Sequence, residues 1–163
     1  MIGKTSEVIE KMISYYNSDV RRINHFLKVH SFAKSIGELE KLNEEIQYIL
    51  EIAAIVHDIG IKVSEQKYNS SAGNYQEIEG PPIAKNMLLQ LDIDEDIIER
   101  VCYLVGHHHT YSTIDGMDYQ ILIESDFLVN IYEDNIKSEQ IKLIKDKYFR
   151  TETGIKFLNN MYL

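Results

Sequence analysis

Apolar residues recur along this chain mainly at spacings of three and four positions, and seldom at spacings of two. A repeat near 3.6 residues is typical of amphipathic α-helices, whereas alternation of apolar and polar residues would indicate β-strands. Val8, Met12 and Tyr16 form the first such face, and similar faces follow along most of the sequence. We find no alternating segment of useful length and no internal repeat. The pattern therefore predicts an all-α fold, with residues 1–163 in a single domain.

Residues that favour helix ends divide this pattern into separate helices. Asp19 and Asn43 precede apolar segments, where their short side chains can accept hydrogen bonds from first-turn N–H groups. Gly37 is the expected end of the helix that follows Asp19, because glycine is favoured just beyond a helix C-terminus. The other expected helices run from residue 43 to the segment 57–60, from 81 to about 91, from 94 to 105 and from about 118 to 129, with two weaker segments after Ser138 and Thr151.

One segment departs from the helical pattern. Residues 64–80 read SEQKYNSSAGNYQEIEG, which is mostly polar, rich in Ser, Asn and Gly, and has little periodicity. Pro81 and Pro82 follow directly and suit the first turn of a helix, where the missing N–H removes no hydrogen bond. We therefore expect a long loop from Ser64 to Gly80. Loops of this length in compact domains are more often functional than incidental, with a disordered surface excursion as the alternative.

The composition is that of an ordinary globular protein, with 44% hydrophobic and 26% charged residues. Asp and Glu outnumber Lys and Arg by 26 to 17, and the formal net charge is −9. Sequence-specific binding of nucleic acid needs many cations that neutralise phosphates, so this charge argues against it. The single cysteine, Cys102, excludes an internal disulfide and a thiolate zinc site.

The sequence also lacks the usual signals for secretion or membrane insertion. The first residues, MIGKTSEVIEKM, contain acids where a signal peptide requires an apolar stretch. The best apolar run, from Ile52 to Val56, is far too short to span a bilayer. We therefore expect a cytoplasmic protein without membrane contact. Its five Met and eleven Tyr residues could furnish a patch for a homodimer.

Of the six histidines in the chain, His25 lies on an apolar helix face. It is followed at four-residue spacing by Val29 and Ala33, so the three side chains share one face. His30 lies about 140° around the same helix, and we expect it at the surface. The sequence thus predicts a buried histidine in this helix, and neutral histidine is a common ligand of divalent metals.

Two aspartates stand in equally apolar surroundings. Asp58 follows His57 at the end of an apolar helix, and Asp126 lies on an apolar face three residues after Ile123. An ionised aspartate is almost never buried unless it is paired or bound to a metal. A capping aspartate beside a hydrogen-bonded histidine would explain the His57-Asp58 pair taken alone. Because His25 and Asp126 accompany the pair, we interpret all four residues as metal ligands.

These residues, in this order, resemble the HD domain, a superfamily of metal-dependent phosphohydrolases. RRINHFLKV resembles the family's first-histidine helix, AAIVHDIGIK its His-Asp signature and IESDFLVN its closing aspartate. The resemblance covers about residues 19–132 and implies a helical HD-type domain, on which helices within residues 138–163 are expected to pack. In one departure, Ile61 stands between Asp-Ile-Gly and Lys62, whereas the family often has lysine directly after the glycine.

Several HD subfamilies carry further histidines that bring in a second metal. One commonly lies in a His-Gly-Pro-like stretch, where this chain has Glu79-Gly80-Pro81. The resemblance therefore implies Glu79 as a carboxylate ligand, whereas a merely helix-capping Glu79 would leave a single-metal site. Another is a histidine or histidine pair after an apolar helix, and VCYLVGHHH supplies three candidates. Helical phase favours His108, with His109 beside it, over His107.

The resemblance implies hydrolysis of a phosphate ester or anhydride in a small phosphorylated molecule, a nucleotide above all. The donor set lacks thiolate and suits one or two ions of Fe, Mn, Co, Ni or Zn. Asp58 is expected to bridge two metals at the catalytic centre, and Lys62 to contact a phosphate oxygen. The other residues considered for contact with the substrate are Lys67, Lys85 and Arg22 for phosphate, and Tyr68 and Tyr75 for stacking on a base.

Three alternatives remain open at this point. A non-catalytic HD module would bind a nucleotide and signal through a partner protein. A di-iron oxygenase on the same fold would consume oxygen instead of releasing phosphate. A plain helical scaffold would carry the histidines incidentally, which is difficult to reconcile with ligand residues in the family's order.

Overall fold

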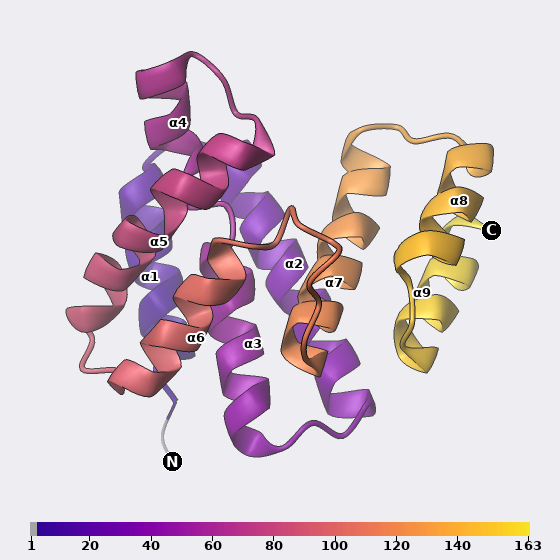
Figure 1. Cartoon of the computed structure of the whole chain (residues 1–163), viewed down its shortest axis with the longest axis horizontal. Helices are drawn as coiled ribbons and strands as arrows, with labels where there is room; N and C mark the ends of the chain where they lie inside the picture. The colour runs from indigo at the N-terminus through magenta and orange to yellow at the C-terminus, as the bar shows by residue number, and fades with distance from the viewer. Residues whose placement is uncertain (1–2) are drawn as a thin grey trace.

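The computed structural model describes residues 3–163, and within that range the chain forms nine α-helices and no strand (Figure 1). The all-α prediction is therefore confirmed. None of the helices in residues 3–163 combines the length and the apolar character that crossing a membrane requires. In chain order, the helices are α1 (Thr5–Tyr16), α2 (Val20–Leu39), α3 (Glu44–Val56), α4 (Ile61–Tyr68), α5 (Gly73–Leu89), α6 (Glu95–Val105), α7 (Met117–Glu133), α8 (Ser138–Tyr148) and α9 (Glu152–Tyr162).

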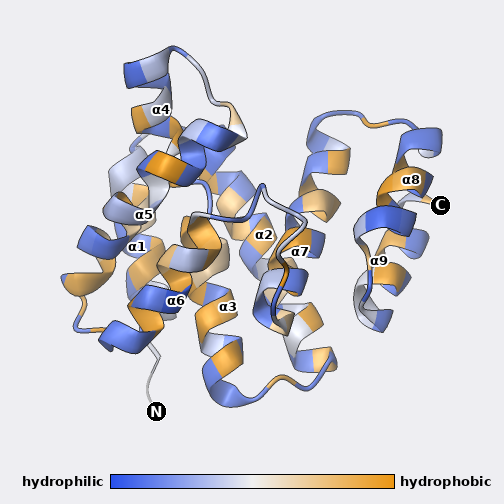
Figure 2. Cartoon of the chain, in the orientation of Figure 1, coloured by the Kyte–Doolittle hydropathy of each residue, from blue (hydrophilic) through white to orange (hydrophobic). Residues whose placement is uncertain are grey.

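The helix α3 lies at the centre of the hydrophobic core. It packs against α1, α2, α6 and α7, and its residues from Ile52 to Val56 are all fully buried. Figure 2 shows that the helices carry both apolar and polar residues, in keeping with the amphipathic spacing of the sequence. Because α3 ends at Val56, the two residues that follow it, His57 and Asp58, also lie in the interior.

The capping residues that the sequence indicates begin their helices as expected. The side chain of Asp19 accepts a hydrogen bond from the N–H of Arg22 at 3.3 Å, and that of Asn43 from Ile46 at 2.9 Å. Asp94 precedes α6 without such a bond. These caps place the starts of α2 and α3, and α2 carries His25 in its second turn.

Gly37 does not end α2, contrary to the expectation from the sequence, because α2 continues to Leu39. A Cβ atom at Gly37 would overlap the side chain of Gln47 in α3. Glycine at this position therefore permits the close packing of α2 on α3 and does not terminate the helix.

The expectation of a long loop over residues 64–80 is also wrong. This segment contains most of α4 and the first two turns of α5, and only residues 69–72 connect the two helices. Asn69 ends α4 in the left-handed conformation, with φ of 54°, which is a usual helix stop. Only Ile61 and Ser64 are buried in α4, so the helix has no apolar stripe that the sequence could display. The two prolines lie inside α5 and not in its first turn.

Two glycines bring α5 against the segment that follows Asp58. A Cβ atom at Gly60 would lie 2.7 Å from the backbone nitrogen of Gly80 and 2.8 Å from the carbonyl oxygen of Gln76. Real Cβ atoms do not approach backbone so closely, so this contact requires glycine. The contact places the start of α5, with the buried Gln76, beside the His57-Asp58 turn.

The helices α8 and α9 belong to the same apolar core as the rest of the chain. Ile141, Phe149 and Leu158 are buried within the core cluster that also contains the residues of α3. The helix α9 packs against α7 and α2, and α8 packs against α7 and α9. Because one core runs through all of these helices, we propose that residues 3–163 form a single domain; the first two residues lie outside the described part of the chain.

A buried carboxylate joins these C-terminal helices to α7. Glu124 has no exposed surface and accepts hydrogen bonds from the backbone N–H groups of Arg150 and Thr151, at 2.9 and 3.0 Å. The Thr151 hydroxyl and the Gln120 amide also donate to it, at 2.5 and 2.6 Å. Burial raises the pKa of Glu124, against the opposing effect of these hydrogen bonds. The carboxylate thus satisfies backbone donors at the start of α9.

We expect Glu124→Ala to destabilise the fold, because it removes the acceptor of two backbone N–H groups and leaves them unsatisfied. Each unsatisfied buried donor costs about 1–3 kcal/mol, so the free energy of unfolding in urea should fall by about 2–5 kcal/mol. Glu99→Ala, at an exposed position of α6, is the matched control and should change the free energy of unfolding by less than about 0.5 kcal/mol. Equal stability of the two variants would contradict the role given to Glu124.

Candidate metal centre

A polar cavity of about 630 Å³ lies between the N-terminal part of α2 and the C-terminal part of α7. The two helices pack against each other and run side by side in Figure 1. Arg22 and His25 line the cavity from α2, and Asp126 and Glu133 line it from α7. Asp58, which follows α3, lies in the same lining. The cavity therefore opens onto the residues that the sequence singles out.

Four of the expected ligands converge at the base of this cavity. The Nε2 atoms of His25 and His57 lie 3.3 Å apart, and each lies 3.2 Å from an oxygen of Asp126. The second carboxylate is that of Asp58, whose Oδ2 lies 3.2 Å from His25 Nε2 and 3.3 Å from His57 Nε2. All four side chains are buried. Two nitrogens and two carboxylates thus surround one point, and this cluster could hold a divalent metal ion.

A second group of candidate ligands shares Asp58 with the first. The Oδ1 atom of Asp58 lies 2.9 Å from His108 Nε2 and 3.9 Å from His109 Nε2. Because the Oδ2 atom faces His25 and His57, the two oxygens of Asp58 face two different groups. This is the geometry that a bridging carboxylate needs. The structure brings together His108 and His109 with Asp58, as the sequence analysis expected.

Hydrogen bonds to Nδ1 fix the orientation of three of these imidazoles. The Nδ1–H of His57 donates to the carbonyl oxygen of Ala54 at 2.7 Å, and that of His108 to Val105 at 2.9 Å. The Nδ1–H of His25 donates to Oε1 of Glu133 at 2.7 Å. In a neutral imidazole, a proton on Nδ1 leaves the lone pair of Nε2 free for a metal, and in each case Nε2 is the atom that faces the aspartates. Histidines that bind metals in proteins are usually oriented by such bonds.

Hydrogen bonds also hold the backbone of the segment that carries Asp58. The buried Tyr16 of α1 donates its hydroxyl to the carbonyl oxygen of Asp58 at 3.0 Å. The N–H of Ile59 donates to the carbonyl of Val56, which makes a tight turn after α3. The His57-Asp58 pair is therefore anchored through its backbone as well as through its side chains.

The two buried carboxylates set the electrostatics of the site. Burial acts to lower the pKa of His25, but hydrogen bonds to Asp126 and Asp58 outweigh it and raise the pKa to about 11. Burial likewise opposes charge on His57, and the charges of Asp58 and Asp126 raise its pKa to about 10. Burial acts to raise the pKa of Asp58, but the charge of His57 and the hydrogen bond from His108 hold it well below its usual range. The cluster thus stabilises positive charge at its centre.

His109 differs from its neighbours in the triplet. Its Nε2 lies 3.0 Å from Oε1 of Gln76, and its ring packs against Gly73, where a Cβ atom would lie 2.8 Å from the ring. Burial first, and then the neighbouring His108, lower the pKa of His109 to about 4. His107 points elsewhere, because its Nδ1–H donates to the carbonyl of Tyr103 at 2.7 Å.

Glu79 does not join either group of candidate ligands, although the resemblance implied that it would. Its carboxylate accepts hydrogen bonds from Lys67 Nζ and from the hydroxyl of Tyr68, both at 2.9 Å. Gln76 and Gly80 occupy the face of α5 that meets the His57-Asp58 turn, and Glu79 lies on the side that meets α4. The unexpected helix α4 supplies the partners that keep Glu79 away from the cluster.

Lys62 does not reach the cavity either. Its Nζ donates to the carbonyl oxygen of Tyr15 at 3.2 Å and lies 4.8 Å from the centre of the Tyr15 ring. Because Lys62 is the second residue of α4, its side chain projects toward α1 and not toward Asp58. The guanidinium groups of Arg21 and Arg22 line the cavity instead.

Two further expectations about aromatic and histidine side chains need correction. Tyr68 and Tyr75, which were considered for stacking on a base, stack on each other with ring centres 4.1 Å apart. His30 is half-buried and not fully at the surface, because its Nε2 lies 3.2 Å from Oε1 of Glu51. It nevertheless points away from the cluster, toward α3.

Sequence reasoning missed two residues whose side chains form hydrogen bonds with the imidazole rings of expected ligands. Glu133 contacts His25 and Gln76 contacts His109. Glu133 follows Asp126 by seven residues, which is two helical turns and places both on one face of α7. That spacing was a usable signal for Glu133. Gln76 had none, because its segment was interpreted as a loop.

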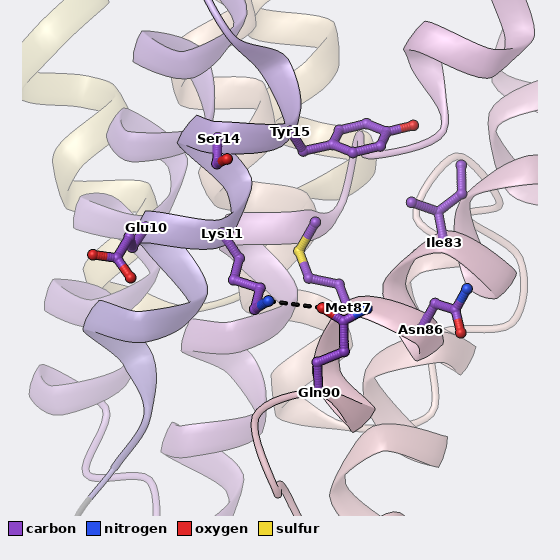
Figure 3. Close-up of a pocket in the computed structure, with 8 residues that line it drawn as sticks. All are labelled: Glu10, Lys11, Ser14, Tyr15, Ile83, Asn86, Met87 and Gln90. Atoms are coloured by element: carbon purple, nitrogen blue, oxygen red, sulfur yellow. Dashed lines mark hydrogen bonds between the residues drawn. The ribbon is translucent and has the colours of Figure 1, made fainter.

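A second cavity, of about 620 Å³, lies in a groove between α1 and α5 (Figure 3). Lys11 bridges this groove with a hydrogen bond of 2.7 Å to Gln90, and Tyr15 and Met87 also line it. The described residues that line it include no histidine and only one carboxylate, that of Glu10. The groove therefore offers no set of metal ligands, and the first cavity is the candidate site.

Comparison with known proteins identifies the fold and the family of this chain. No curated protein sequence matches this chain. A crystal structure of a predicted HD superfamily hydrolase from an uncultured Thermotogales bacterium has a TM-score of 0.70 and 21% sequence identity, over 97% of this chain and 84% of that chain. At this identity, the likeness shows a shared fold. The HD domain model matches residues 22–145, from the start of α2 into α8. The chain therefore belongs to the HD domain family.

Proposed function

We propose that the protein is a metal-dependent phosphohydrolase that acts on a phosphate ester or anhydride. The observation that carries the proposal is the convergence of His25, His57 and Asp126 with one oxygen of Asp58 around a single point. The other oxygen of Asp58 faces His108. Such an arrangement suits a pair of cations that share one carboxylate, which is a common clamp for displacement at phosphorus. Family membership supports the same reaction class.

The donor set fits divalent transition metals. It combines neutral imidazole nitrogens with carboxylate oxygens and contains no thiolate, which suits Fe, Mn, Co, Ni or Zn. We propose His25, His57, Asp58 and Asp126 as ligands of one ion, and Asp58, His108 and His109 as ligands of a second. When bound, such ions supply positive charge that acidifies water and neutralises phosphoryl oxygens.

The charge of the cavity lining makes substrate binding depend on metal. Carboxylates outnumber guanidinium groups in this lining, in which Arg21 and Arg22 are the lysine or arginine residues present. A phosphate dianion is repelled by such an excess of negative charge unless cations offset it. Arg22 also forms ion pairs with Asp19 and Glu65, at 3.4 and 2.5 Å, which hold it at the rim. We propose that both arginines contact the phosphoryl group of the substrate.

The substrate class is a further part of the proposal. A small nucleotide is the class that the sequence analysis favours, and a cavity of about 630 Å³ has room for one. The only aromatic ring in the described lining besides the histidines is Phe26, which is fully buried. A base would therefore be held by polar groups such as Asn130 and not by stacking.

We expect the purified protein to release phosphate from a panel of nucleotides and other phosphate esters, and only with a divalent metal. Asp58→Asn should lower turnover at least about 100-fold, because it removes the charge shared by both groups of ligands. Glu79→Gln is the matched control, since Glu79 lies outside the cluster, and should keep turnover within about threefold. Oxygen consumption without phosphate release would favour the oxygenase, and binding of a nucleotide without turnover would favour the signalling module.

Removal of metal should lower thermal stability. An ion that binds only the folded state adds stability that grows with the ratio of its concentration to its Kd, about 2.7 kcal/mol at a hundredfold excess. Differential scanning calorimetry before and after chelation should show a lower Tm in the chelated protein, restored by Mn²⁺ or Zn²⁺. An unchanged Tm, together with elemental analysis that finds no transition metal in protein from metal-replete cells, would contradict the metal site.

His25 and His30 give a matched pair of variants on one helix. His25→Gln should weaken metal binding at least about tenfold, because it removes one of few direct ligands. His30→Gln removes only the contact with Glu51, so metal affinity should stay within about threefold while stability falls by about 1 kcal/mol. Titration calorimetry with Mn²⁺ measures the metal affinity of both variants, and unfolding in urea measures their stability. Loss of affinity in the His30 variant alone would move the first ligand to His30.

A further inference from the structure

His25 differs from the other two anchored histidines in the nature of its Nδ1 acceptor. His57 and His108 each donate to a backbone carbonyl of their own segment, three residues earlier in the chain. His25 donates to the carboxylate of Glu133, which belongs to another helix. Only in His25, among these three, is the acceptor a charged side chain that a substitution can remove.

Glu133 has no evident role within its own helix. It is the last residue of α7, and the C-terminal end of a helix dipole disfavours negative charge. The last turn of α7 contains no basic residue that could offset it. The side chain of Glu133 is nevertheless mostly buried, with only 17% of its surface exposed, and its Oε1 lies 2.7 Å from His25 Nδ1. The contact with His25 is therefore the interaction that accounts for a largely buried carboxylate at this position.

We propose that Glu133 is a positioning residue that makes His25 a competent metal ligand. Its carboxylate keeps the proton of His25 on Nδ1 and fixes the plane of the ring, so that the lone pair of Nε2 faces Asp58 and Asp126. A negative acceptor also increases the electron density of the imidazole and hence its strength as a donor. The inference rests on the metal site of the proposed function, and it does not require that the reaction be phosphate hydrolysis.

The arrangement on α7 gives this role a simple structural basis. Asp126, Asn130 and Glu133 follow one another at spacings of four and three, so one face of α7 carries them all into the cavity lining. Asp126 faces Nε2 of His25, at 3.2 Å, while Glu133 holds Nδ1 of the same ring. A single helix thus contacts both nitrogens of His25, through two side chains that lie two helical turns apart.

The test uses the full-length protein, stripped of metal, with Zn²⁺ as the probe. Glu133→Ala removes both the acceptor and the charge, and should weaken Zn²⁺ binding in titration calorimetry by about 10–100-fold. Glu133→Gln keeps an acceptor oxygen and loses the charge, and should give a loss of at least about threefold that is smaller than that of the alanine variant. Asp134→Asn is the matched control, because Asp134 lines the same cavity but forms no hydrogen bond to His25 among the described residues.

A second readout reports the position of the proton. Long-range ¹H–¹⁵N spectra of the Zn²⁺-loaded protein should show His25 protonated on Nδ1, assigned by the loss of its signals in His25→Gln. In Glu133→Ala the Nδ1 proton should exchange faster with water, and in Glu133→Gln its protection should be partly restored. A purely structural role for Glu133 would leave this proton unchanged and alter only the melting temperature.

The outcomes separate this inference from the proposed function. Zn²⁺ affinity in Glu133→Ala within threefold of the wild type, or an equal loss in Asp134→Asn, overturns the role of Glu133. If the alanine variant does not fold, Glu133→Gln decides, and an affinity equal to that of the wild type overturns it. Wild-type protein that binds no Zn²⁺ overturns the inference together with the metal site. Protein that binds Zn²⁺ but releases no phosphate removes only the hydrolytic function.

Discussion

Two aspartate carboxylates lie inside an apolar helical core, and the positive charge that they require constrains much of the surrounding structure. Asp58 and Asp126 are both more than nine-tenths buried, in the lining of a polar cavity that adjoins the aliphatic core around α3. Burial of unpaired carboxylates is strongly unfavourable. Three histidines contact these carboxylates, and each is held by an Nδ1 hydrogen bond that turns Nε2 toward the acids. The same arrangement that stabilises the carboxylates therefore prepares a site for a cation.

The helices supply this arrangement by converging from different parts of the chain. The helix α3 carries His57 and Asp58 into the centre because nearly all of its C-terminal half is buried. The helix α2 presents His25 and α7 presents Asp126, and the two pack against each other over the cavity. His108 lies three residues after the end of α6, and its Nε2 faces Asp58. Because α3 contacts all three of these helices, a change in its packing would move every ligand at once.

The segment between α3 and α6 determines what else reaches the cavity. Contact between Gly60 and Gly80 brings the start of α5 beside Asp58, and this contact places Gln76 against His109. The short helix α4 binds Glu79 through Lys67 and Tyr68, and so keeps that carboxylate at the periphery. The second group of candidate ligands therefore contains one carboxylate, that of Asp58, whereas the first contains two, those of Asp58 and Asp126. On the proposed function, a second ion would be held less tightly than an ion bound at His25 and His57.

Local patterns in the sequence determined the helical fold, several of the helix starts and the residues around the first group of ligands. Periodicity identifies a buried face from a few neighbouring residues, so the burial of His25 and Asp126 followed from their places on apolar stripes. The capping roles of Asp19 and Asn43 are equally local. Only the tertiary structure decided where Glu79 and Lys62 point and that Glu133 contacts His25, because these contacts depend on which helices meet. A polar surface helix such as α4 has no apolar stripe, and a glycine such as Gly37 can serve either a helix end or a close contact; such choices are made by packing between distant segments and not by the local sequence.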